Sequence, residues 1–196
     1  MSILDYFKKI EKKIINKLEI NKTNLIKEKE VIEVFTDGSS FNNGKKNAQA
    51  GFGVYFGEND IRNISKKIIN KQTNNVGELL AIYNALLILS QDNKLNDIIK
   101  IYTDSEYCLK IFQSHYNKYK KMCNAWIIKW KMKDFKDVKN KDIIKNIDKL
   151  LLKFKNVEFI HVLSHKTAPL NTESKEYRIW FGNKQADILA QKGAKS

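Results

Sequence analysis

The 196 residues of this chain are enough for one substantial hydrophobic core, and a single proline with eight glycines argues against long flexible linkers. The formal net charge of +14 favours a polyanionic partner, although a base bias in the genome would also scatter lysines along a chain in this way. Two cysteines without metal-binding spacing, no secretory signal and no apolar run of about 20 residues predict an intracellular protein that does not associate with a membrane.

Residues 1–30 carry apolar side chains at intervals of three and four, with lysines between them, which predicts an amphipathic helix. Such a helix either packs on the rest of the chain or forms a separate arm that contacts nucleic acid or another partner. We therefore predict a lysine-rich helical extension over 1–30 and one main domain over 31–196.

The main domain begins with three predicted strands. Residues 31–36 are β-branched and aromatic and predict a buried strand that ends at a turn formed by Asp37 and Gly38. Residues 50–56 and 61–69 predict a second and a third strand, joined by a short polar turn. Connections this short favour an antiparallel meander.

The second half of the chain alternates helices with strands. The predicted elements, in order, are a helix over 78–89, a strand over 98–103, a helix capped by Ser105, helices within 116–156, a strand over 157–163, and a helix that Asn183 caps and that ends near Lys192. This order predicts an α/β fold with a five-stranded mixed sheet, three antiparallel strands followed by parallel crossovers, and helices on both faces.

Four acidic residues lie at the ends of these elements. Asp37 and Asp104 follow buried strands, Glu78 opens a helix, and Asp187 lies one turn into the last helix. Because ligand sites in open α/β sheets lie at the carboxyl ends of strands, we expect the four carboxylates to converge. Clustered carboxylates repel one another unless cations neutralise them, and Mg²⁺ prefers oxygen ligands. The pattern therefore predicts a divalent-metal site.

The chemistry that such a site favours is two-metal hydrolysis of a phosphodiester. One ion activates the attacking water and the other stabilises the leaving oxygen, with the ions about 3.5–4 Å apart. His165 follows the fifth predicted strand as Asp37 and Asp104 follow theirs, and is a candidate for proton transfer or product release. His115 and His161 are interpreted as structural or solvated residues.

Five short motifs follow one another in the order of the predicted elements. They are Thr36-Asp37-Gly38-Ser39 with Asn43, Thr73-Asn74-Asn75-Val76-Gly77-Glu78-Leu79, Tyr102-Thr103-Asp104-Ser105-Glu106-Tyr107, Ser164-His165, and Asn183-Lys184-Gln185-Ala186-Asp187. With these motifs in this order, the chain from about Val31 to Lys195 resembles type 1 ribonuclease H, the endonuclease that cuts the RNA strand of RNA–DNA hybrids.

The resemblance implies a ribonuclease H-like fold and a catalytic site of known composition. It implies that Asp37, Glu78, Asp104 and Asp187 bind two Mg²⁺ ions, which Mn²⁺ can replace, and that His165 assists them. The implied products carry 5′-phosphate and 3′-hydroxyl ends. The implied partner is an RNA–DNA hybrid, bound by a monomer that needs no small-molecule cofactor and no membrane.

The resemblance also implies contacts with the substrate. The residues at matching positions are Asn43, Asn74 and Asn75 for the minor groove of the hybrid; Lys71, Thr73 and Asn140 for a phosphate of the DNA strand; Ser105 for the RNA strand; and Trp126 and Trp130 for the DNA strand, within a basic protrusion-like segment over 116–141. From spacing alone, this pair of tryptophans four residues apart is typical of a helix that packs inward.

The chain departs from the family in two places. The insertion loop predicted over 166–182 is longer than usual and contains Pro169, Arg178, Trp180 and Phe181, so that it forms either a lid over the site or surface packing. Residues 1–30 lack the pattern of the hybrid-binding domain found in many eukaryotic members.

Two other functions stay open at this point. One is a different nuclease or a recombinase of the same fold, since a fold does not determine a substrate. The other is a nucleic-acid-binding module without activity, against which the presence of all four acids argues.

Overall fold

The computed structural model describes residues 12, 29–116, 130, 138–164 and 166–196. The chain forms two compact units, Met1–Glu30 and Val31–Ser196. The helix predicted over 1–30 lies almost entirely outside the described residues, so both interpretations of that segment stay predictions. Within the described part of the chain, no helix is long and apolar enough to cross a membrane.

The second unit is built on a five-stranded sheet with the strand order β3-β2-β1-β4-β5. β1 pairs antiparallel with β2 and β2 with β3, whereas β1 pairs parallel with β4 and β4 with β5. The strands are β1 (Val31–Phe41), β2 (Gln49–Tyr55), β3 (Ile64–Lys67), β4 (Ile98–Thr103) and β5 (Asn156–His161). This arrangement confirms the predicted mixed sheet. It also makes β1 and β4 the neighbours at which the strand order reverses, the usual place for a ligand site.

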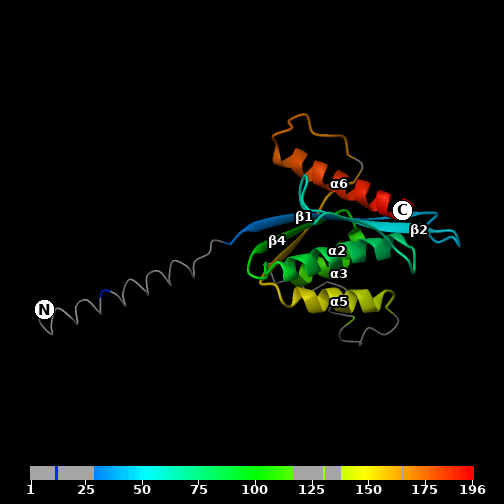
Figure 1. The fold of residues 1–196 in the computed structure, drawn as a ribbon, viewed down its shortest axis with the longest axis horizontal. Coiled ribbons are helices and arrows are strands. Elements are labelled where there is room, and N and C mark those ends of the chain that lie inside the picture. The colour runs from blue at the N-terminus through cyan, green and yellow to red at the C-terminus, as the bar shows by residue number, and fades with distance from the viewer. Residues whose placement is uncertain (1–11, 13–28, 117–129, 131–137, 165) are drawn as a thin grey trace, which may run out of the picture. The chain divides into compact units, whose positions relative to one another are not determined.

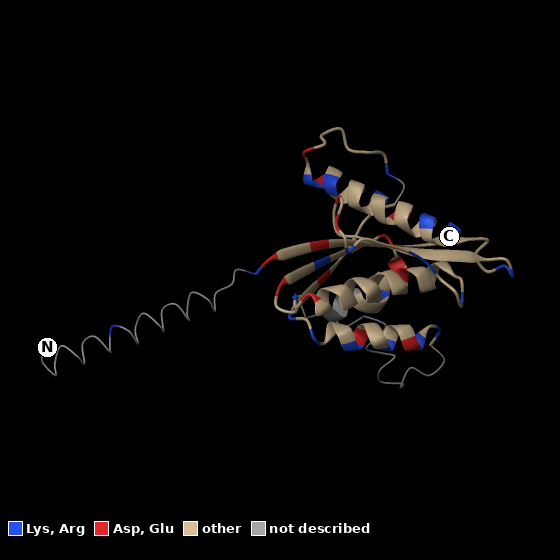
Figure 2. Cartoon of the chain, viewed as in Figure 1, with Lys and Arg blue, Asp and Glu red and all other residues tan. Residues whose placement is uncertain are grey.

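Helices cover both faces of the sheet, as predicted. α2 (Asn74–Gln91), α3 (Glu106–Tyr116) and α5 (Lys141–Leu151) lie on one face, and α6 (Lys175–Lys195) lies on the other (Figure 1). Acidic and basic residues alternate along α5 (Figure 2). The main core lies under α2, α3 and α5, while a smaller cluster under α6 includes Phe35, Tyr55 and Tyr102.

α2 is the central helix of the main core. Thr73 caps it, since its hydroxyl accepts a hydrogen bond from the backbone N–H of Val76. The helix is apolar on most of its circumference because it contacts both the sheet and α5. Its first half lies against β1, which brings Glu78 to the sheet.

Three predicted boundaries in the first half of the main domain are wrong. β1 does not end at Asp37 and Gly38 but continues to Phe41, and its pairing with β2 runs through both residues. α2 begins at Asn74, which places Glu78 in the second turn and not the first. Gly38 is thus a strand residue beside a helix, and not a turn residue. β3 is shorter than the predicted 61–69 because Asp60 and Arg62 form a turn before it.

The last helix also differs from the prediction. α6 begins at Lys175, where the Ser174 hydroxyl accepts a hydrogen bond from the Tyr177 N–H at 3.0 Å. Asn183 is therefore inside the helix and not its N-cap. The predicted insertion loop over 166–182 is a loop only up to Ser174, and Trp180 and Phe181 are helical. The helix needs glycine at position 182, because a Cβ there would lie 2.4 Å from the Phe35 ring.

Candidate active site

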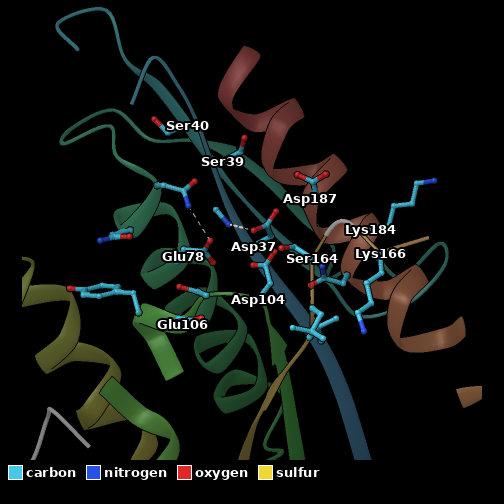
Figure 3. A pocket seen from close by; sticks show the side chains of 18 of the residues that line it. Asp37, Ser39, Ser40, Glu78, Asp104, Glu106, Ser164, Lys166, Lys184 and Asp187 are labelled. Atoms are coloured by element: carbon cyan, nitrogen blue, oxygen red, sulfur yellow. Dashed lines mark hydrogen bonds between the residues drawn. The ribbon is translucent and has the colours of Figure 1, made fainter. Parts of the chain in front are cut away.

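Three of the four predicted acids form one group. Asp37 in β1, Glu78 in α2 and Asp104 directly after β4 each offer a carboxylate oxygen, and these oxygens lie within 4.8 Å of one another (Figure 3). The register of the parallel pair explains the proximity of the two aspartates. Phe35 pairs with Tyr102, and Asp37 and Asp104 each lie two residues further along their strands.

Glycine at position 38 allows Glu78 to join this group. A Cβ on Gly38 would lie 2.3 Å from the backbone nitrogen of Glu78, and one on Gly77 would lie 2.9 Å from the Gly38 Cα. The backbones of β1 and α2 are therefore in direct contact, which only residues without a Cβ permit. The Glu78 carboxylate consequently lies beside the carboxylate of Asp37, the residue before Gly38.

Asp187 faces the same pocket from α6 but is not part of the three-acid group. Both of its carboxylate oxygens accept hydrogen bonds from Gln191 Nε2, at 2.8 and 3.0 Å. α6 packs closely on β2 because Gly53 has no side chain, since a Cβ there would lie 2.2 Å from the Ala186 carbonyl oxygen. The structure thus brings all four acids to one pocket, with three grouped and the fourth on its wall.

Burial and mutual repulsion shift the acid–base properties of this site. Burial raises the pKa of Asp37 well above its ordinary value, and the negative charges of Asp104 and Asp187 raise it further. Burial likewise raises the pKa of Glu78, followed by the charges of Asp37 and Asp104. Among the described residues, no lysine or arginine forms an ion pair with Asp37 or Glu78.

The hydrogen bonding of Glu78 shows what the site is suited to hold. Its Oε1 accepts a hydrogen bond from Asn74 Nδ2 at 3.4 Å, whereas its Oε2 is buried without any partner. A buried carboxylate oxygen without a donor is costly unless a cation binds it. Grouped hard oxygen ligands, one of which is buried without a donor, fit a divalent metal ion.

The predicted minor-groove residues lie together at one end of the pocket. Asn74 and Asn75 line it, and the Asn43 side-chain oxygen accepts a hydrogen bond from the Asn74 N–H at 3.3 Å. Ser105 lines it as well and caps α3, because its hydroxyl accepts from the Cys108 N–H. The prediction that Ser105 caps this helix is confirmed.

The other predicted substrate residues that the structure describes do not line the pocket. Thr73 and Asn140 are the N-cap residues of α2 and α5, and both Lys71 and Asn140 have a positive φ. Asn140 hydrogen-bonds Tyr107, which lines the pocket. Trp130 is half-buried against the main core, in agreement with the inward packing that its spacing favours. His165 and Trp126 lie outside the described residues.

Sequence reasoning missed part of the pocket, which has a volume of about 730 Å³. Lys166, Trp180 and Lys184 line it but were not predicted as site residues. Trp180 and Lys184 precede Asp187 by seven and three residues, so helical spacing from Asp187 would have indicated them. The misplaced start of α6 hid this signal for Trp180, whereas Lys184 was already within the predicted helix.

The ribonuclease H family model matches residues 28–195 of the chain. The chain belongs to the ribonuclease H family. Ribonuclease H of Schizosaccharomyces pombe is 38% identical over 167 residues, which are 82% of this chain and 52% of that protein. Ribonuclease H of Clostridium botulinum (strain Hall) is 32% identical over 143 residues, which are 70% of this chain and 86% of that protein. The predicted membership of the type 1 group is confirmed.

The fold is also that of solved ribonucleases H. A crystal structure of LC11-RNase H1 in complex with an RNA/DNA hybrid has a TM-score of 0.51 at 21% identity, covering 84% of this chain and 96% of that one. The chain spans about half the length of the eukaryotic ribonucleases H that it matches.

Proposed function

We propose that residues 31–196 form an endoribonuclease that hydrolyses the RNA strand of RNA–DNA hybrids and leaves 5′-phosphate and 3′-hydroxyl ends. The observation that carries the proposal is the group of three acids with one buried oxygen, Glu78 Oε2, that has no partner. The names of the relatives support the choice of reaction, and the hybrid bound to LC11-RNase H1 supports the choice of substrate. We further propose that the protein acts inside the cell as a monomer.

Asp37, Glu78, Asp104 and Asp187 would hold two Mg²⁺ ions, which Mn²⁺ could replace. When bound, such ions activate the attacking water and stabilise the leaving oxygen of a phosphodiester. The chain orients the ligands beforehand. The Gly38 N–H donates to Asp37 Oδ1 at 2.9 Å, and Asn74 donates to Glu78 Oε1. Glu78 Oε2, which is buried without a hydrogen-bond partner, would then be available to an ion.

Recognition of the hybrid would use residues on both sides of the acids. We assign Asn43, Asn74 and Asn75 to the minor groove, where side-chain amides bond base edges and the RNA 2′-hydroxyl. Ser105 would contact the RNA strand, and His165 would assist proton transfer or product release.

The DNA strand would be held further from the acids. Lys71, Thr73 and Asn140 are assigned to one of its phosphates, and the segment over 116–141 with Trp126 and Trp130 to its backbone. Because Trp130 packs on the core, its part would be to anchor that segment and not to touch the strand.

A cleavage assay tests the proposal. An end-labelled RNA–DNA hybrid, duplex RNA and duplex DNA would each be incubated with Mg²⁺, with Mn²⁺ and with EDTA. We expect cleavage of the hybrid alone, only with a divalent ion, and at the RNA strand alone.

The Asp104→Asn variant should lose turnover but keep binding the hybrid. Asp97→Asn is the matched control, because Asp97 pairs with Lys94 and does not line the pocket. Cleavage of duplex DNA at the same rate would favour a different nuclease of this fold. Binding of the hybrid without any cleavage would favour a module without activity.

A further inference from the structure

One face of α6 extends the candidate site beyond its acids. Three residues follow Trp180 at helical spacing, namely Asn183, Lys184 and Asp187, which are three, four and seven positions further along. This spacing places all four on one side of a helix. All four line the pocket. Of these four residues, only Asp187 is one of the predicted metal-binding acids. The role of the other three has to be explained separately.

Trp180 fixes two lysines on this wall of the pocket. Its Nε1–H donates to the backbone carbonyl of Lys166 at 2.9 Å, and the Nζ of Lys184 lies over its ring, 4.9 Å from the centroid. Both lysines line the pocket and lie on the α6 side of the acids (Figure 3). In the part of the chain that the structure describes, neither pairs with a carboxylate. Two exposed cations beside the acids suit an anionic ligand.

Asn183 adds a second, independent feature. It is 8% exposed, it lines the pocket, and its Oδ1 is buried without a hydrogen-bond partner. Among the described side chains, only Glu78 Oε2 shares this condition. A lone buried acceptor costs stability until a donor reaches it. Next to two lysines, a ligand that combines an anionic group with a hydrogen-bond donor would satisfy both features.

We propose that Lys166, Asn183 and Lys184 form a subsite for the ribonucleotide next to the phosphate that is cut. The two ammonium groups would bind its phosphate, and Asn183 Oδ1 would accept a hydrogen bond from its 2′-hydroxyl. Trp180 is a positioning residue that acts through the lysines. The subsite rests on the proposed function, because it takes the RNA strand as its ligand.

The charge part is tested by binding. In the full chain carrying Asp104→Asn, the affinity for a fluorescent RNA–DNA hybrid would be measured at several salt concentrations. Lys166→Ala with Lys184→Ala should weaken binding about tenfold and reduce the slope of log K against log salt by roughly 1 to 2. Lys192→Ala, on the same helix but outside the pocket, should leave that slope nearly unchanged by comparison.

The hydroxyl part is tested with modified substrates. Single 2′-deoxy substitutions would be moved along the RNA strand near the cut. At one position the substitution should weaken binding to the Asp104→Asn parent about fivefold, the loss of one hydrogen bond. The same substitution should have no effect once Asn183→Ala is added. This loss of sensitivity cannot arise from a general structural defect, which would weaken binding of both hybrids.

The role of Trp180 is tested by combining variants. Trp180→Phe keeps a ring under Lys184 but removes the hydrogen bond to Lys166. It should weaken binding, and Lys166→Ala should then add little to that loss.

Two results would overturn the subsite. One is an unchanged affinity and salt slope in the double lysine variant. The other is equal sensitivity to every 2′-deoxy substitution with and without Asn183. In both cases the proposed function stands if the Asp104→Asn parent still binds the hybrid. If that parent binds no hybrid, both the subsite and the proposed function are overturned.

Discussion

Two acidic residues of β1, four positions apart, have opposite environments. The Glu33 carboxylate accepts a hydrogen bond from the Tyr102 hydroxyl at 2.8 Å and pairs with Arg178 at 3.3 Å. Asp37 lies among other acids, which raise its pKa together with burial. The strand therefore carries one acid that the chain neutralises itself and one that no lysine or arginine of the described residues neutralises.

The difference separates structural from functional carboxylates. An acid with its own cation contributes to the packing of α6 against the sheet and needs nothing from outside. Grouped acids without a cation weaken folding, and a chain keeps such a group where an external cation is used. Glu33 is the internal reference against which the site can be tested.

The largest expected effect distinguishes these two acids by activity. Asp37→Asn should reduce hybrid cleavage by about two to three orders of magnitude, the cost of removing one preorganised electrostatic group. Glu33→Gln should leave the cleavage rate near that of the parent, because Glu33 does not line the pocket. Both rates would be measured under single turnover with Mg²⁺. Equal losses in the two variants would contradict the division.

A smaller effect is expected from the backbone contact that brings Glu78 to Asp37. Gly38→Ala should lower the free energy of unfolding by about 1–3 kcal/mol, since the new methyl group overpacks the contact with α2. It should also weaken Mg²⁺ binding, because Glu78 would move away. Urea unfolding and calorimetric titration measure the two effects.

Gly57→Ala is the matched control for this substitution. A Cβ at Gly57 meets no atom within 4 Å, so neither quantity should change. Full stability of Gly38→Ala would show that α2 can move off the strand at no cost.

The unusual pKa values of Asp37 and Glu78 predict a pH dependence of stability. In the unfolded chain these groups titrate near their ordinary values of 3.8 and 4.5, and in the folded protein they titrate higher. The folded state therefore holds more protons, so their contribution to stability falls as pH rises from about 4 through the raised pKa values. For each pKa unit between the unfolded and the folded state, the free energy of unfolding at high pH falls by about 1.4 kcal/mol.

Glu78→Gln isolates this contribution. In EDTA, its stability relative to the parent should increase over the same pH range, because the variant has no charge to bury. Adding Mg²⁺ should stabilise the parent more at high pH than at low pH, since the ion binds the ionised acids. Thermal melts at several pH values would measure both trends, and a parent melting temperature that Mg²⁺ leaves unchanged at pH 8 would contradict them.

The smallest effect concerns the neutralised acid. The Arg178 side chain is 59% exposed, so its pair with Glu33 is screened by solvent. Arg178→Ala should cost at most about 1 kcal/mol in the free energy of unfolding. A larger loss, measured by urea unfolding, would mean that Glu33 depends on its cation as strongly as buried acids do.

Much of this fold follows from patterns within single elements. The apolar strands, the Ser105 cap and the order of the elements predicted the mixed sheet and helices on both faces. The predicted convergence of Asp37 and Asp104 rested on two strands ending alike. The parallel register of β1 and β4 brings the two residues together although β1 continues to Phe41.

Two of the errors involve glycines whose surroundings are distant in the sequence. Gly38 was interpreted as a turn residue because a glycine after an aspartate commonly ends a strand, yet here it allows contact with α2. Gly182 directly precedes the predicted N-cap Asn183, whereas in the structure it lies inside α6 beside the Phe35 ring. No local pattern distinguishes a glycine that turns from one that lets two backbones meet.

The two helices that carry Glu78 and Asp187 approach the acids from opposite faces of the sheet. Cations held by the four acids would tie the outer layers of the domain together through its central strands. Metal binding would then slow amide hydrogen exchange along α2 and α6, including at positions far from the acids. An enzyme of this design would be more rigid when loaded with metal than when idle.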